Sequence, residues 1–146
     1  MAGFERHVDV VWQGGLKDGN GEAKAGTGAF TLPVTFPSRV ESPQGRTSPE
    51  ELMAAAHAAC YAMALSATLG RQNASADRLD VSATVQADLG EGGIKIHTSR
   101  LKVKATGLKG IDAARFAEVA REAEGKCPVS NAYRGGLKIE LDATAS

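Results

Sequence analysis

The chain has 146 residues, with 17 Lys and Arg against 17 Asp and Glu, so its formal net charge is zero at pH 7. We expect a single domain over residues 1–146, because this length is enough to bury a hydrophobic core. The balanced charge gives no support for a nucleic-acid or membrane-surface partner. The N-terminus lacks the apolar segment of a secretory signal, and no stretch suggests a membrane span, so we expect a cytoplasmic protein.

The N-terminal third has the pattern of β-strands. Apolar residues alternate over 8–12, which predicts a half-buried strand. Glycines and an Asp-Gly pair between 14 and 21 predict a hairpin turn. Alternation returns over 30–36, where Pro33 favours an edge strand because proline has no N–H to donate. A polar loop is expected from 37 to 47.

A long helix is predicted from Pro49 to Gly70. Ser48 is a good N-cap, and proline suits the first helical position. Glu51 lies three residues after Ser48, as in a capping box. The apolar residues of this segment recur at helical spacing and many are alanine, which allows another helix or another subunit to approach closely.

The C-terminal half alternates between strand and helix patterns. Strands are predicted over 79–89 and 94–105, with a glycine-rich turn between them and a bulge near Thr98 and Ser99. Asp112 caps a second helix that stops at Gly125. A short helical turn and a last strand over 137–141 follow. The order β-β-β-α-β-β-α-β, with strands joined by hairpins, predicts an α+β fold with antiparallel sheet.

Two cysteines, Cys60 and Cys127, are the candidates for chemistry. In a chain without a secretory signal, a pair of thiols favours redox cycling or metal binding over a structural disulfide. Cys60 lies about twelve residues into its helix, where a thiol on an apolar face is inert and has a raised pKa. An inert core cysteine is therefore the alternative reading. To react, Cys60 needs a cation from elsewhere, and Arg39 is a candidate.

Cys127 has the more favourable local environment. Because Pro128 suits a first helical position, Cys127 would be the N-cap of a short helix whose free amides stabilise a thiolate. Lys126 adds a neighbouring positive charge. By local electrostatics alone, Cys127 is the better thiolate, with an incidental N-cap cysteine as the alternative.

Glu50 lies in the first turn of the long helix, close to the loop that carries Arg39. A carboxylate there could orient the guanidinium by bidentate hydrogen bonds and place it over a thiolate. The helix dipole by itself also favours an acidic residue at this position, so a purely structural role stays open.

Metal binding is the rival interpretation. His57 and Cys60 lie three residues apart on one helical face, and Cys127 with His97 or His7 could complete a site. The closely spaced ligand pairs of structural zinc sites are missing, however. Nucleotide-binding and serine-hydrolase motifs are also missing from the sequence.

The residues around both cysteines resemble the OsmC/Ohr family of thiol peroxidases, and specifically its OsmC branch. Residues 47–52 and 55–60 read TSPEEL and AAHAAC, similar to the first family motif, with Ser48 where Asn is usual. Residues 125–130 read GKCPVS, similar to the second motif with Lys126 inserted. Residues 36–39 read FPSR and resemble the segment that carries the catalytic arginine.

The resemblance implies an intertwined homodimer in which antiparallel sheets wrap around central helices, with active sites at the dimer interface. It makes Cys60 the peroxidatic thiol and Cys127 the resolving thiol, which reverses the local ranking. Arg39 and Glu50 become the pair that activates Cys60. No metal or other cofactor is needed.

The reaction that the resemblance implies is the reduction of organic hydroperoxides, alkyl or fatty-acid, to alcohols. The external reductant is a dithiol or a small thiol, and a lipoyl protein and thioredoxin are both open. The alternative is a non-catalytic binding or metal-holding protein with the same fold.

Overall fold

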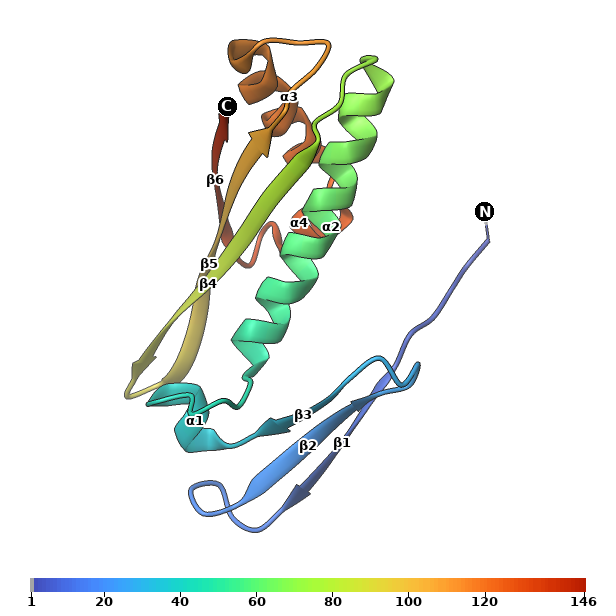
Figure 1. The fold of residues 1–146 in the computed structure, drawn as a ribbon. Helices are drawn as coiled ribbons and strands as arrows, with labels where there is room; N and C mark the ends of the chain where they lie inside the picture. Colours follow the sequence, from blue (N-terminus) through green and yellow to red (C-terminus); the bar gives the residue numbers. More distant parts are fainter. Residues whose placement is uncertain (1) are drawn as a thin grey trace. The chain divides into compact units, whose positions relative to one another are not determined.

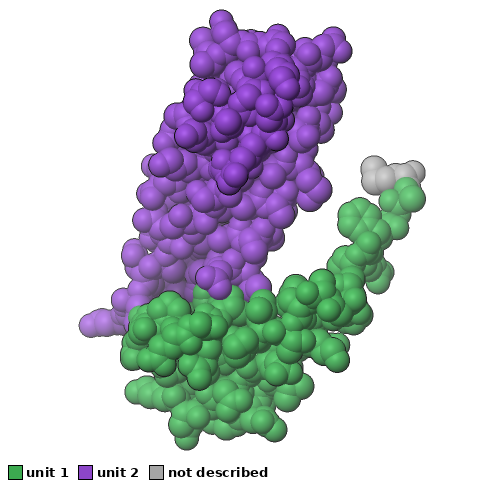
Figure 2. Space-filling view, in the orientation of Figure 1, with its two compact units in different colours: residues 1–49 green, residues 50–146 purple. Residues whose placement is uncertain are grey.

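In a computed structural model, which describes residues 2–146, the chain forms two compact units (Figure 2). The N-terminal unit is Met1–Pro49 and the C-terminal unit is Glu50–Ser146. Each contains its own three-stranded sheet, in the orders β1-β2-β3 and β4-β5-β6. Together with the helices they confirm the predicted α+β class.

The N-terminal sheet consists of β1 (Val8–Gln13), β2 (Asn20–Ala25) and β3 (Thr31–Val34), all antiparallel. The predicted hairpin turn lies between β1 and β2, where Gly14 has φ +89°, a value that favours glycine. Pro33 is in an edge strand, as predicted, where its missing N–H leaves no gap in a central ladder.

Strand β1 differs from its expected burial. All six of its residues are exposed in the single chain, including Val10 at 61% and Val11 at 64%. The alternation predicted that one face of this strand is buried, but in the single chain both faces are exposed. Such an apolar edge strand is a surface that a partner can cover.

Residues 36–40 form a short helix, α1 (Phe36–Val40), which the sequence pattern did not predict. Thr35 caps it: its Oγ1 accepts from the N–H of Ser38 at 3.1 Å, and the Ser38 hydroxyl oxygen accepts from the N–H of Thr35 at 3.2 Å. This capping box and the proline that follows it start a helix, although the alternation over 30–36 predicted that the strand continues to residue 36. The last turn of α1 carries Arg39.

The long helix α2 (Pro49–Arg71) begins where predicted and ends one residue beyond Gly70. Its mean hydropathy over 18 residues is 1.4, so by length and composition it could cross a membrane. The sequence expectation of no such stretch is therefore wrong, because alanine raises the mean hydropathy. The buried side chains of His57 and Thr68 on this helix form hydrogen bonds with other groups of the chain.

The C-terminal sheet is built on a long antiparallel hairpin of β4 (Arg78–Gly90) and β5 (Gly93–Thr106) (Figure 1). Gln86 pairs with Thr98 and the next residue of β4 pairs with Ile96, so one residue of β5 between them is extra. This bulge lies next to its predicted position.

Strand β6 (Lys138–Ala145) corrects the prediction of a wholly antiparallel fold, because it pairs with β5 in parallel. Between the two strands the chain forms α3 (Ala113–Lys126) and α4 (Pro128–Tyr133). A connection through helices returns the chain to the same end of the sheet, which makes parallel pairing possible.

The C-terminal unit has one hydrophobic core, to which α2, β5 and α3 all contribute. Alternate residues of β5 point into it, and the lysines between them are exposed. Each large side chain that is fully buried stabilises the fold by about 1.5–3 kcal/mol. The core contains Tyr61, Leu65, Leu69, Leu101, Val103, Ala105, Phe116, Val119, Ala120 and Ala123.

Candidate active site

The fold brings the two cysteines into contact. The pKa of Cys60 is raised, first by burial and then by the neighbouring side chain of Cys127, and it is partly lowered by a hydrogen bond from the backbone N–H of Val129. Cys60 is partly exposed, Cys127 is buried, and both are free thiols. Two sulfurs from distant parts of the sequence therefore share one site.

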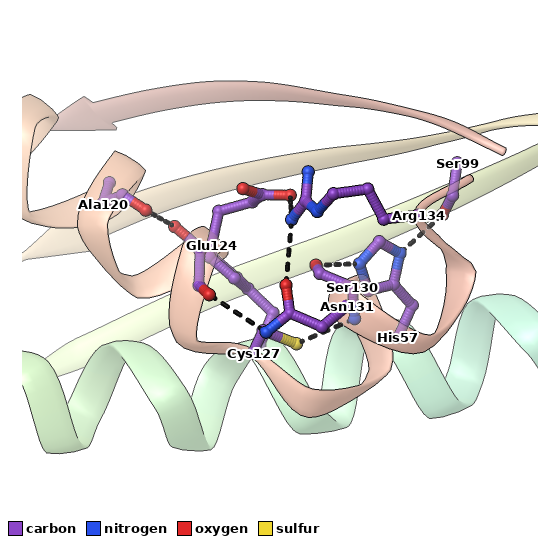
Figure 3. Close-up of polar contacts among 10 residues, drawn as sticks. His57, Ser99, Ala120, Glu124, Cys127, Ser130, Asn131 and Arg134 are labelled. Atoms are coloured by element: carbon purple, nitrogen blue, oxygen red, sulfur yellow. Dashed lines mark hydrogen bonds and ion pairs between the residues drawn. The ribbon is translucent and has the colours of Figure 1, made fainter.

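Cys127 lies at the junction of two helices. Its N–H donates to the carbonyl of Glu124 at 3.2 Å, which ends α3. Its sulfur accepts from the N–H of Ser130 at 3.5 Å, which starts α4 (Figure 3). The predicted N-cap is confirmed, with Pro128 in the first turn.

Further polar contacts connect the C-terminal end of α3 to α4 around Cys127 (Figure 3). Arg134 forms a 2.7 Å ion pair with Glu124, whose side chain is only 16% exposed. The Asn131 amide donates to the carbonyl of Gly125 at 3.0 Å. These bonds restrain the turn that carries the buried thiol.

His57 lies one turn before Cys60 and is completely buried. Its Nδ1 is 2.6 Å from Ser99 Oγ on β5, and its Nε2 is 2.7 Å from Ser130 Oγ on α4 (Figure 3). Burial lowers the pKa of His57, so the neutral ring is favoured. The sequence pattern offered His57 as a candidate metal ligand and did not single out Ser99 or Ser130 as its partners.

The metal-site alternative finds no support in this geometry. Both ring nitrogens of His57 face serine hydroxyls, and within residues 2–146 no three His, Cys, Asp or Glu side chains gather where a metal ion could bind. His97, another of the candidate ligands, instead has its Nε2 at 3.5 Å from Oδ2 of Asp88.

Arg39 lies in the N-terminal unit, and Glu50 lies ten residues before Cys60 on the same helix, so the approach of either side chain to Cys60 stays a prediction. Glu50 is in the first turn of α2. Arg39 lines a pocket of about 240 Å³ in the N-terminal unit. The other lining residues are mostly apolar: Trp12, Leu16, Val34, Thr35, Phe36 and Pro49. A cation at an apolar pocket suits a ligand with both an apolar and a polar part.

A partly exposed thiol beside a buried thiol is an arrangement typical of dithiol redox proteins. Such a pair can pass between the dithiol and the disulfide. The comparisons with known proteins agree with this class.

The OsmC-like protein family model matches residues 42–142. Peroxiredoxin OsmC of Escherichia coli K12 is 35% identical over 130 residues, 88% of this chain and 90% of that protein. Organic hydroperoxide resistance protein OhrB of Bacillus subtilis is 28% identical over 123 residues, 84% of this chain and 88% of that protein. The OhrB crystal structure superposes with a TM-score of 0.72 at 27% identity, covering 94% of this chain and 98% of that one.

The chain therefore belongs to the OsmC-like family, which confirms the resemblance seen in the motifs. Its relatives are named peroxiredoxins and organic hydroperoxide resistance proteins. The chain is accordingly an enzyme of the peroxidase class, an oxidoreductase with an antioxidant role.

Proposed function

We propose that this enzyme reduces organic hydroperoxides, alkyl or fatty-acid, to alcohols by oxidising Cys60 and then Cys127. The observation that carries the proposal is the contact between the two thiols. An inert core cysteine would need neither partial exposure nor a second thiol beside it. The proposed catalytic unit is the whole chain, residues 1–146.

In the first step the Cys60 thiolate attacks the distal peroxide oxygen. The O–O bond breaks, the alkoxide takes a proton and leaves as the alcohol, and Cys60 becomes a sulfenic acid. Burial opposes ionisation of Cys60, and none of the causes that shift its pKa is a positive charge. The Arg39 guanidinium would supply that charge and would stabilise the developing oxyanion.

In the second step Cys127 resolves the sulfenic acid. Its thiolate attacks the Cys60 sulfur, the hydroxide leaves with a proton as water, and a disulfide forms. The Ser130 N–H donates to the sulfur of Cys127. An external dithiol, such as a lipoyl protein or thioredoxin, or a small thiol then returns both cysteines to the reduced state. A reducing cytoplasm suits this cycle.

The pocket beside Arg39 supports a substrate with an apolar tail. Its lining is dominated by aromatic and aliphatic side chains, including Trp12 and Phe36. Burial of apolar surface contributes about 25 cal/mol per Å², so alkyl chains gain affinity that hydrogen peroxide does not.

A homodimer would complete the site. Glu50 and Cys60 are ten residues apart on one helix, which separates them by about 15 Å along the axis. A Glu50 that acts at Cys60 must then come from a second copy of the chain. The exposed β1 and Met63, which is 68% exposed on α2, are surfaces that a second copy can cover.

Trapping of the oxidised thiol tests this function. Cys60→Ser and Cys127→Ser variants are treated with cumene hydroperoxide and a sulfenic-acid probe, and the labelled peptides are identified by mass spectrometry. We expect label on Cys60 in the Cys127 variant and none in the Cys60 variant. Labelling of Cys127 at the wild-type rate in the Cys60 variant would reverse the assignment. No peroxide consumption by the wild type, with stoichiometric metal after chelator-free purification, would favour the binding alternative.

A further inference from the structure

His57 is a buried polar side chain that the proposed reaction does not use. It connects three elements, because the ring belongs to α2 and its nitrogens contact Ser99 of β5 and Ser130 of α4. A neutral imidazole donates from one nitrogen and accepts at the other, so each serine hydroxyl has a matching role. The ring is therefore held in one orientation from both sides.

Ser130 links His57 to the resolving thiol. Its hydroxyl meets His57 Nε2 at 2.7 Å, and its backbone N–H donates to the Cys127 sulfur at 3.5 Å. Ser130 therefore contacts His57 through its hydroxyl and the Cys127 sulfur through its backbone N–H. Figure 3 shows Ser130 between the imidazole ring and Cys127.

Helix α4 depends on such tertiary contacts for its position. It has only six residues, and helices this short are not stable by themselves in water. The ring of Tyr133 meets the His57 ring edge-on, with centroids 5.3 Å apart, and its hydroxyl donates to the carbonyl of Met53 at 2.9 Å. His57 therefore lies at the centre of the packing contact between α2 and α4.

We propose that His57 is a positioning residue for the resolving step: through Ser130 it holds the first turn of α4 so that Cys127 is aligned to attack the oxidised Cys60. This inference rests on the proposed function. The step that it governs is attack of the Cys127 thiolate on the Cys60 sulfenic sulfur, with loss of water and formation of the disulfide. The first turn of α4 also contacts Cys60, because the Val129 N–H donates to its sulfur, so attack on peroxide depends on α4 only through this one bond.

A matched pair of serine variants tests the proposal. Ser130→Ala and Ser99→Ala each remove one hydroxyl from the same imidazole, but only Ser130→Ala removes the hydrogen bond between the imidazole and α4. In single-turnover experiments with cumene hydroperoxide, quenched with a sulfenic-acid probe, Ser130→Ala and His57→Leu should slow disulfide formation roughly tenfold or more, because small misalignments are costly. Ser99→Ala should slow it less. The first oxidation, to which α4 contributes the Val129 N–H at Cys60, should slow less than disulfide formation in Ser130→Ala and His57→Leu.

A longer-lived sulfenic acid gives a second readout. With excess peroxide it is oxidised further to the sulfinic acid, so Ser130→Ala should accumulate more sulfinic Cys60 than Ser99→Ala. Unfolding midpoints measured beside the kinetics show whether a variant has only lost stability. The inference is overturned if disulfide formation keeps its wild-type rate in folded Ser130→Ala, or if both serine variants slow both steps in proportion to their loss of stability.

Oxidation by diamide separates this inference from the proposed function. Diamide forms an adduct with one thiolate, and the second thiolate displaces it to give the disulfide without any peroxide. If the wild type forms no sulfenic acid with hydroperoxide, the proposed function fails, but slow closure with diamide in Ser130→Ala still supports the positioning role. Equal closure rates with diamide in wild type, Ser130→Ala and His57→Leu contradict it.

Discussion

In the proposed mechanism Cys60 loses its proton in a place where burial favours the thiol. Within its own unit the hydrogen bond from Val129 is the one cause that lowers its pKa, while burial and Cys127 raise it. A reactive thiolate in such a place needs a cation that the local sequence does not provide. The chemistry of a single residue is thus set by groups that are distant along the chain.

The first prediction at this scale concerns Arg39→Ala. Removing the guanidinium should raise the pKa of Cys60, so that the thiolate fraction at pH 7 and the rate of peroxide attack both fall about tenfold or more. The measurement is the pH dependence of alkylation of Cys60 in a Cys127→Ser background. Arg46→Ala removes an arginine from the same unit outside the apolar pocket and is the control. An unchanged titration in Arg39→Ala would take Arg39 out of the mechanism.

A second prediction follows from the buried ring of His57, whose pKa is lowered from its ordinary value of 6.5 by burial. The unfolded chain takes up a proton near pH 6.5 that the folded chain resists. Stability is therefore full above this pH and is lost as pH falls below it. Urea unfolding between pH 7.5 and pH 5.5 should show a steeper loss in wild type than in His57→Gln. Parallel curves for the two proteins would mean that His57 titrates normally when folded.

At the scale of elements, the caps decide where helices begin. Asp112 caps α3 as predicted, and its Oδ1 accepts from the N–H of Arg115 at 2.8 Å. Thr35 caps α1 in the same way, but the alternation that runs through this segment indicated a strand. A helix of five residues leaves almost no periodic signal, so its cap alone could have revealed it.

Asp112→Ala is the prediction that belongs to this scale. Loss of the cap should lower the free energy of unfolding by about 1 kcal/mol, because one N–H of the first turn loses its partner. Denaturant titration measures the change. Asp112→Ser keeps a capping oxygen and should recover most of it. An equal loss in both variants would show that the charge of Asp112 matters and its capping bond does not.

At the scale of the whole molecule, the proposed dimer can be tested by complementation. Cys60→Ser and Glu50→Ala chains, each impaired alone, are co-refolded so that mixed dimers form. If Glu50 acts on the Cys60 of its partner, each mixed dimer has one intact site, and random mixing should restore about a quarter of wild-type activity. No recovery, in a mixture shown to contain mixed dimers, would mean that Glu50 does not act across the interface.

The sequence by itself determined the local structure: the start of α2, the cap of α3, the position of Cys127 as an N-cap and the β4–β5 hairpin. Each depends on residues within a few positions of one another, so short-range patterns suffice. The motifs around both cysteines also indicated the family.

Only the tertiary structure decided which distant groups meet. It put Cys127 against Cys60, a pairing that the sequence implied only through the family motifs. It also placed His57 between Ser99 and Ser130 and paired β6 in parallel with β5. The physical reason is that burial, hydrogen-bond partners and strand neighbours come from segments far apart in the chain. No local spacing encodes them, although they determine what a thiol or an imidazole can do.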